Sequence, residues 1–221
     1  MVFLFYGNNC CLHQQSMSKL LSILLCIFCL SFTLISSHKK TFTEKEINNN
    51  STLVTLKNHA ITLKQFCKSS HFDTSVCFLI DMNIPNGKNR FFVYSFKKDS
   101  VLLSGLVAHG NSSSLFYQKE VKFSNQLNSY CSSQGRYKIG ESYYGRFGLA
   151  YKLYGLDTSN SNAYNRFVVL HAHSCVPDKE VYPDFICNSL GCPTVSPNFL
   201  KTLQEQYLLK TKQPVCMWIY K

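Results

Sequence analysis

The sequence lacks the features that mark nucleic-acid-binding proteins and metal sites. Its formal net charge is +11, but the basic residues are scattered, and the only adjacent lysines are Lys39-Lys40 and Lys97-Lys98. Without a basic helix or patch, a nucleic-acid partner is not expected. No C-x-x-C pair occurs after residue 37, and no internal repeat is visible. The cysteine spacing therefore matches no strong zinc signature.

Charged residues are also few, at 16% of the 221 residues, whereas hydrophobic residues make up 45%. Such a chain can bury a real core, so global disorder is excluded. The length suits one domain with a short N-terminal segment. Phenylalanine and tyrosine are plentiful, at 17 and 13, and with the recurring β-branched residues they favour strands over helices.

The N-terminal segment is typical of a secretory signal peptide. One lysine follows Met17, residues 20–37 carry no charge, and His38 then begins a basic stretch. An uncleaved membrane anchor is the alternative, although the apolar run is short for a span of roughly 20 residues. No small residue precedes Cys26 or Cys29, which argues against a lipoprotein anchor. We expect a leader at 1–37, with Met17 a candidate initiator, a linker at 38–56 and one domain at 57–221.

Export changes the meaning of the cysteines. Eleven are present, and four of them lie in or before the leader. The seven that remain are Cys67, Cys77, Cys131, Cys175, Cys187, Cys192 and Cys216. In an oxidising compartment an odd number leaves at least one thiol unpaired, and catalysis is one reason to keep it. The sequence alone does not give the pairing.

Hydrophobic patterning predicts a mainly β domain with peripheral helices. Helices are expected at about 57–69 and at 197–208, the second with Ser196 as N-cap and Pro197 in its first turn. Long loops are expected at 110–135 and 157–165. Strands are expected at 77–82, 90–96, 101–109, 137–140, 149–154, 166–173 and 214–220.

One pair of segments has the residue types needed for nucleophilic catalysis. His171 lies on a predicted strand, and Cys192 follows Gly191 in a predicted turn. A thiol needs a neighbouring base to become a thiolate, and a glycine lets backbone N–H groups approach an oxyanion. The pair also has other readings: a structural histidine with a buried or disulfide-bonded cysteine, or a zinc site. The zinc ligands would be His171, His173, Cys175, Cys187 and Cys192.

The run from about Phe91 to Tyr220 resembles the exported murein L,D-transpeptidase catalytic domains, in the branch whose active-site turn reads S-x-G-C-P. The matching segments occur in order and span well over half of the chain. They are LVAHG at 106–110, FSN at 123–125, SSQGRYKIGESYYG at 132–145, YKLYGLD at 151–157, VVLHAH at 168–173 and NSLGCPTV at 188–195.

The resemblance implies a β-sandwich-like catalytic domain with Cys192 as nucleophile and His171 as general base. It implies an oxyanion-binding turn at Leu190, Gly191 and Cys192, supported by Ser189. It also implies a backbone carbonyl that orients the imidazole, and no metal or organic cofactor. Tyr143 and Tyr144 match a segment that would line the acyl-donor groove or pack in the core. One departure is Ala172, because relatives usually carry glycine there.

The expected reaction is acyl transfer on peptidoglycan stem peptides in the periplasm or cell envelope, by a monomer that contacts the membrane only through its leader. Cys192 would form a thioester, and an amine of a second stem would resolve it. Two alternatives remain: an L,D-carboxypeptidase, in which water resolves the thioester, and a non-catalytic cell-wall-binding module. A papain-like peptidase is rejected because there the cysteine precedes the histidine.

Overall fold

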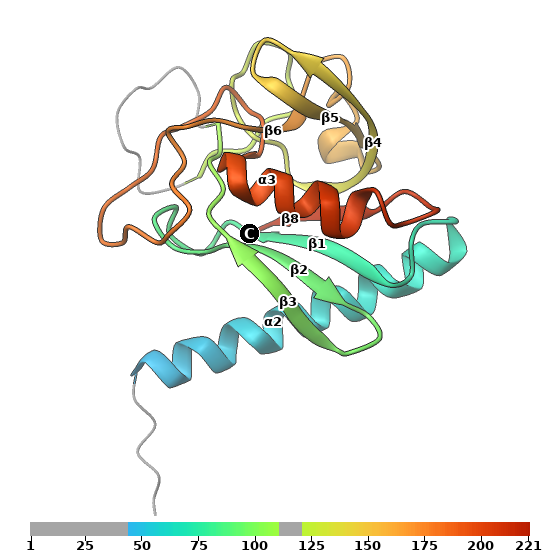
Figure 1. Cartoon of the computed structure of the whole chain (residues 1–221), viewed down its shortest axis with the longest axis vertical. Helices are drawn as coiled ribbons and strands as arrows, with labels where there is room; N and C mark the ends of the chain where they lie inside the picture. Colours follow the sequence, from blue (N-terminus) through green and yellow to red (C-terminus); the bar gives the residue numbers. More distant parts are fainter. Residues whose placement is uncertain (1–43, 111–120) are drawn as a thin grey trace, which may run out of the picture. The chain divides into compact units, whose positions relative to one another are not determined.

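The strands of the domain join in one mixed sheet that is flanked by helices (Figure 1). The computed structural model describes residues 44–110 and 121–221, and the contacts divide the chain into units at 1–50 and 51–221. The strand order is β3-β2-β1-β8-β4-β5-β6-β7, with β1–β8 and β6–β7 parallel and the other pairs antiparallel. The strands are β1 (Val76–Asp81), β2 (Phe91–Ser95), β3 (Ser100–Gly105), β4 (Gly135–Gly145), β5 (Gly148–Gly155), β6 (Val169–Ala172), β7 (Thr194–Val195) and β8 (Cys216–Tyr220). The predicted mainly β class with peripheral helices is confirmed.

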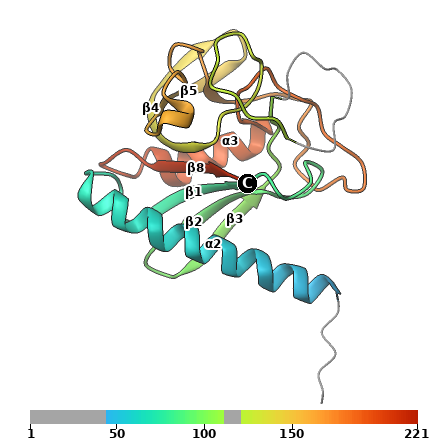
Figure 2. The same cartoon turned by 180° about the vertical axis from the view of Figure 1, so that it is seen from behind.

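Strand β1 is buried on both faces because a helix packs against each. Phe78 and Ile80 point into the core that includes Leu203 of helix α3 (Pro197–Leu203). Leu79, with the opposite orientation, joins the core formed with helix α2 (Glu44–Ser69), which includes Leu56. Figures 1 and 2 show α3 and α2 on opposite sides of this part of the sheet. Full burial of each such side chain contributes roughly 1.5–3 kcal/mol.

Helix α2 is longer than the sequence predicted. Its buried stripe of Leu56, Ala60, Leu63 and Cys67 has the expected helical spacing. The helix nevertheless begins at Glu44 and not near residue 57, so the expected linker at 38–56 is wrong for residues 44–56. Helix growth from a packed end adds one hydrogen bond per residue, which outweighs the poor propensity of the asparagines at 48–50.

Most predicted strands are confirmed, with shifted ends. The β4–β5 hairpin extends further than expected, with a register shift between Ile139 and Ser142, because its exposed outer half is held by strand pairing and not by burial. The strand predicted at 166–173 covers only 169–172, because Phe167 adopts a left-handed conformation with φ 55°. The short strand β7 was not predicted. The predicted helix at 197–208 is confirmed, with Ser196 capping it and its last five residues in π-helical form.

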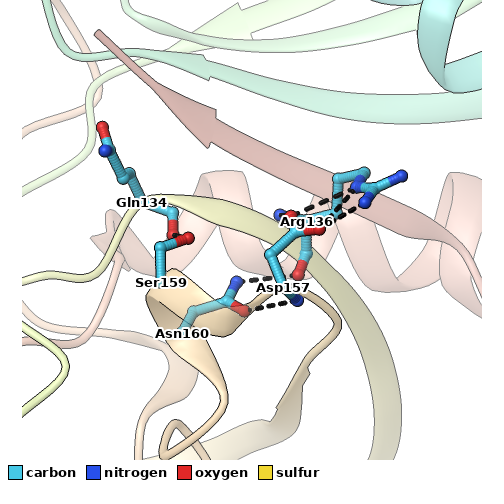
Figure 3. A network of polar contacts seen from close by, with 5 residues as sticks. All are labelled: Gln134, Arg136, Asp157, Ser159 and Asn160. Atoms are coloured by element: carbon cyan, nitrogen blue, oxygen red, sulfur yellow. Dashed lines mark hydrogen bonds and ion pairs between the residues drawn. The ribbon is translucent and has the colours of Figure 1, made fainter.

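A polar network fixes the end of β5 against the start of β4 (Figure 3). The Asp157 carboxylate accepts hydrogen bonds from the backbone N–H and the guanidinium of Arg136. The buried side chain of Asn160 accepts from the Asp157 N–H at 2.9 Å and donates to the Arg136 carbonyl at 2.7 Å. Ser159 donates to the Gln134 carbonyl. These bonds position the strand pair that leads to His171.

No helix within 44–110 or 121–221 is long and apolar enough to cross a membrane. The predicted leader at 1–37 lies outside the described residues. The loop expected at 110–135 ends where β4 begins, at Gly135, and its earlier described residues carry isolated bridges at Gly110, Phe123 and Ser132.

Candidate active site

His171 lies on β6, between β5 and β7, and is buried. Its Nδ1 is 3.1 Å from the carbonyl oxygen of Ala172, and its Nε2 is 2.9 Å from Oγ1 of Thr194. A carbonyl can only accept, so Nδ1 carries the proton and Nε2 accepts from the Thr194 hydroxyl. The expected carbonyl that orients the ring is therefore present, and it belongs to the residue next to His171. This tautomer leaves the basic lone pair on Nε2.

Cys192 is a free, half-buried thiol. Its Sγ accepts a hydrogen bond from the Val169 N–H at 3.4 Å and donates to the Phe167 carbonyl at 3.8 Å. The sulfur therefore lies against the start of the strand that carries His171. The disulfide joins Cys175 to Cys187, so the pairings that would have blocked Cys192 do not occur.

The Cys192 thiol and the His171 imidazole are both uncharged in the free protein. Burial raises the pKa of the Cys192 thiol, and the Val169 N–H and the positive charge of Arg166 offset this only in part. Burial also lowers the pKa of His171; the bond to Ala172 opposes that shift, and the neighbouring His173 adds to it. At neutral pH the free protein thus holds a thiol and a neutral imidazole, a pair that needs a proton transfer before attack.

The turn before Cys192 is closed by the side chain of Ser189. Its hydroxyl donates to the Cys192 carbonyl at 2.6 Å and accepts from the Gly191 N–H at 3.3 Å, which fits the predicted support of loop geometry. Backbone N–H groups on a tight turn of this kind can point at an oxyanion, so those of Leu190 and Cys192 are the candidate donors.

Two glycines allow this turn to pack. Gly191 has φ +114°, and a Cβ there would lie 2.9 Å from the Cys131 carbonyl oxygen. A Cβ on Gly110 would lie 2.3 Å from the Gly191 nitrogen. Gly191 was predicted from the motif. Gly110 is a partner that only the folded chain identifies.

His171 and Cys192 line one cavity of about 220 Å³, together with Ser189, Leu190 and Thr194. We call it the Cys192 cavity. The two catalytic candidates are not hydrogen-bonded to each other, because Thr194 occupies Nε2 of His171. The sequence motif and the fold thus bring together the predicted nucleophile, base and turn.

The β4–β5 hairpin covers the cavity with Phe147. Its ring stacks on His171, with centroids 5.1 Å apart. A second cavity of about 400 Å³ adjoins the first and shares Phe147 and His173 with it. Tyr143 and Tyr144 do not line either cavity; both are exposed on the hairpin, so they are not core residues. Phe147 lines both cavities instead, in the groove-lining role that the resemblance implied for the two tyrosines.

Sequence reasoning missed Thr194, Arg166 and Phe147. Arg166 donates to the carbonyl groups of Ser124 and Cys131, which fixes a distant loop beside the catalytic turn. Thr194 follows Cys192 by two residues and was a recognisable signal. Arg166 and Phe147 carried none, because their contacts depend on loops that only the tertiary fold brings together.

The alternative zinc site is not supported by the described residues. No three histidine, cysteine or acidic side chains among them lie close enough to share an ion. Two of the candidate ligands, Cys175 and Cys187, are joined in the disulfide.

Comparison with known proteins gives one family and several similar structures. No curated protein matches the chain. The chain is similar to an L,D-transpeptidase from Mycobacterium smegmatis, with 11% identity over 66% of this chain and 59% of that one and a TM-score of 0.39. It is also similar to an L,D-transpeptidase from Xylanimonas cellulosilytica, with 12% identity over 71% of this chain and 68% of that one and a TM-score of 0.38. A third similar structure is a helical cell shape determining protein from Campylobacter jejuni, with 11% identity over 66% of this chain and 47% of that one and a TM-score of 0.43. The chain thus spans between 47% and 68% of these three solved chains.

The family assignment rests on a match between this sequence and the model of one protein family. The model of the L,D-transpeptidase catalytic domain matches residues 48–220, which include both predicted catalytic residues and every described strand. The chain therefore belongs to the L,D-transpeptidase catalytic domain family.

Proposed function

We propose that this protein is an exported cysteine acyltransferase that cross-links peptidoglycan stem peptides. One observation carries the proposal: Cys192 is a free thiol in the same cavity as His171, and the Ala172 carbonyl fixes the tautomer that leaves Nε2 basic. The Cys175–Cys187 disulfide supports an oxidising compartment, hence export.

The first step forms the thioester. His171 Nε2 takes the proton of Cys192 Sγ, and the sulfur attacks the carbonyl that precedes the terminal D-alanine of a tetrapeptide stem. Thr194 must first release Nε2, and the Cys192 carbonyl, 3.4 Å from its hydroxyl, is an alternative acceptor. The N–H groups of Leu190 and Cys192 stabilise the oxyanion. The C–N bond then breaks, and the imidazolium returns its proton to the departing D-alanine.

The second step transfers the acyl group. An amine of a second stem attacks the thioester, the C–S bond breaks, and the proton lost by the amine returns to Cys192 through His171. The two adjoining cavities at Phe147 offer room for two stems, which favours an amine acceptor. If water attacks instead, the same residues act as an L,D-carboxypeptidase. No step requires a metal or cofactor.

The test is mass spectrometry of a purified tetrapeptide muropeptide after incubation with the protein. A cross-linked dimer with loss of D-alanine supports transpeptidation, and a tripeptide alone supports the carboxypeptidase. Cys192→Ala abolishes both products. His171→Ala lowers the rate by about 10²–10⁴-fold, because proton removal and proton return are lost together.

A carbapenem separates the enzyme from a binding module. We expect one covalent adduct, on Cys192, in the wild type and in Cys131→Ser, a control that removes a buried free thiol. Absence of any selective adduct, together with an unchanged muropeptide, contradicts the enzymatic assignment.

A further inference from the structure

A separate cavity neighbours the Cys192 cavity and shares one lining residue, Asn188, with it. It measures about 290 Å³, and its polar lining includes Asn86, Arg90, His109 and Asn188. We call it the His109 cavity. Asn188 lines both cavities, and the Ser189 N–H donates to the His109 carbonyl at 3.0 Å. No step of the proposed acyl transfer uses these groups.

His109 presents an unpaired donor. The Arg90 guanidinium lies 2.8 Å from His109 Nδ1, and because arginine only donates, Nδ1 must accept. The ring is neutral, because burial and then the Arg90 charge lower the pKa of His109 to about 3. Its proton is therefore on Nε2. His109 is only 4% exposed, and this N–H finds no acceptor among the residues that the structure describes.

Asn86 presents an unpaired acceptor. Its Nδ2 donates to the Ile186 carbonyl at 3.3 Å, which fixes the orientation of the amide. The opposite atom, Oδ1, is buried and has no donor in the described part of the chain. Leaving a polar atom buried without a partner is costly. The two unpaired atoms thus favour a ligand that accepts at one point and donates at another.

Arg90 adds a positive charge to the wall. It is 1% exposed and donates to the carbonyl groups of Val107 and Ile84. No ion pair joins it to a carboxylate within the described ranges. Burial lowers the pKa of Arg90, and the negative charge of Asp81 opposes that shift from a longer distance. A buried cation without an ion pair attracts an anionic group.

We propose that the His109 cavity binds an α-amino-acid head group, with its adjacent carboxylate and ammonium. The carboxylate accepts from His109 Nε2–H in the field of Arg90, and the ammonium donates to Asn86 Oδ1. A neutral amide would leave the charge of Arg90 uncompensated, and a phosphate would place anionic oxygens against the Asn86 carbonyl oxygen. The volume fits a ligand of this size.

Stem peptides carry such head groups on their diamino acids, so the site would hold one end of a substrate beside the catalytic turn. That link rests on the proposed function, whereas the binding itself does not. Binding is therefore measured in the Cys192→Ala protein, in which no turnover can occur. A muropeptide assay that fails would leave the binding result standing, and the converse holds as well.

The probes are glycine, meso-diaminopimelate, acetate and methylamine, titrated by calorimetry and by protein NMR. We expect saturable binding of glycine and diaminopimelate, weaker binding of acetate and none of methylamine. His109→Asn keeps an acceptor for Arg90 but lacks the Nε2–H, so it weakens glycine and acetate about ten-fold or more. Asn86→Leu keeps the shape without the acceptor, so it weakens glycine while acetate is unchanged.

Asn89 supplies the matched control. Its Oδ1 is also buried with no donor among the described residues, but Asn89 does not line the cavity. Asn89→Ala should therefore bind glycine as the wild type does. Lack of saturation by glycine and diaminopimelate up to about 100 mM in protein with native cavity residues means that water alone fills the cavity and overturns the proposal. Equal weakening in the Asn89 variant, or unchanged binding in both cavity variants, overturns the location.

Discussion

Replacing Gly191 by alanine tests whether the catalytic turn depends on a conformation and a contact that only glycine allows. The φ of +114° is unfavourable for an L-residue, which costs about 1–2 kcal/mol. In addition, the new Cβ would lie 2.9 Å from the Cys131 carbonyl oxygen, so backbone must move, at a further cost of about 1–3 kcal/mol. We expect a total loss of roughly 2–5 kcal/mol in the free energy of unfolding.

Gly148 provides the control for the contact. It also has a positive φ, of +78°, but a Cβ there would meet nothing within 4 Å. Gly148→Ala should therefore lose only about 1–2 kcal/mol. For a domain of this size each kcal/mol lowers Tm by about 2–4 °C, which separates the two variants.

The assay is calorimetric unfolding of both variants, paired with the rate of Cys192 alkylation by iodoacetamide. Gly191→Ala should show the larger fall in Tm and a changed alkylation rate, because the displaced turn carries Cys192. Gly148→Ala should alkylate as the wild type does. Equal falls in Tm with unchanged alkylation would refute the idea that the Cys131 contact constrains the turn.

Three further outcomes follow from the structure. The pKa of His109 is lowered from 6.5 to about 3, so its contribution to stability is present above about pH 6.5 and is lost as the pH falls toward 3. Urea unfolding at several pH values should show a shallower acid-side slope in His109→Asn, and an identical slope would contradict this. Replacing both Cys175 and Cys187 by serine should cost about 3 kcal/mol, because their disulfide closes a short loop; Tm would fall while Cys192 still reacts with a carbapenem. Asn160→Ala leaves the Asp157 N–H without its acceptor, while the Arg136 carbonyl keeps its bond from the Leu156 N–H. The change should cost about 1–3 kcal/mol in denaturant melts, with muropeptide turnover retained. Loss of turnover at full stability would show that this network also shapes the site.

Much of the fold was predictable because its signals are local. The buried strands β1, β2 and β8 are short runs of apolar and aromatic residues, and Ser196 with Pro197 marks the start of α3 as a capped helix. Element ends were less predictable. The N-terminal half of α2 and the outer half of the β4–β5 hairpin carry little apolar pattern, since they are maintained by hydrogen bonding to an already formed element and not by burial.

The candidate site divides in the same way. Cys192, His171 and Gly191 were identified from residue types, spacing and resemblance, because a nucleophile, a base and a tight turn each require a particular side chain or its absence. The sequence by itself also determined that the cysteines could not all pair. Which thiols remain free, Cys192 among them, was decided by the tertiary structure, because disulfide formation depends on distances between segments and not on their order.

Only the folded chain shows that Thr194 occupies Nε2 of His171, that Phe147 stacks on the His171 ring, and that Arg90 fixes the proton of His109 on Nε2. Each of these depends on the direction of a side chain across strands or loops that are distant in sequence. Sequence pattern records which face a residue takes within its own element. It does not record which residue of another strand or loop lies opposite that face. That residue decides which hydrogen bonds form, because their energy falls steeply with distance and angle.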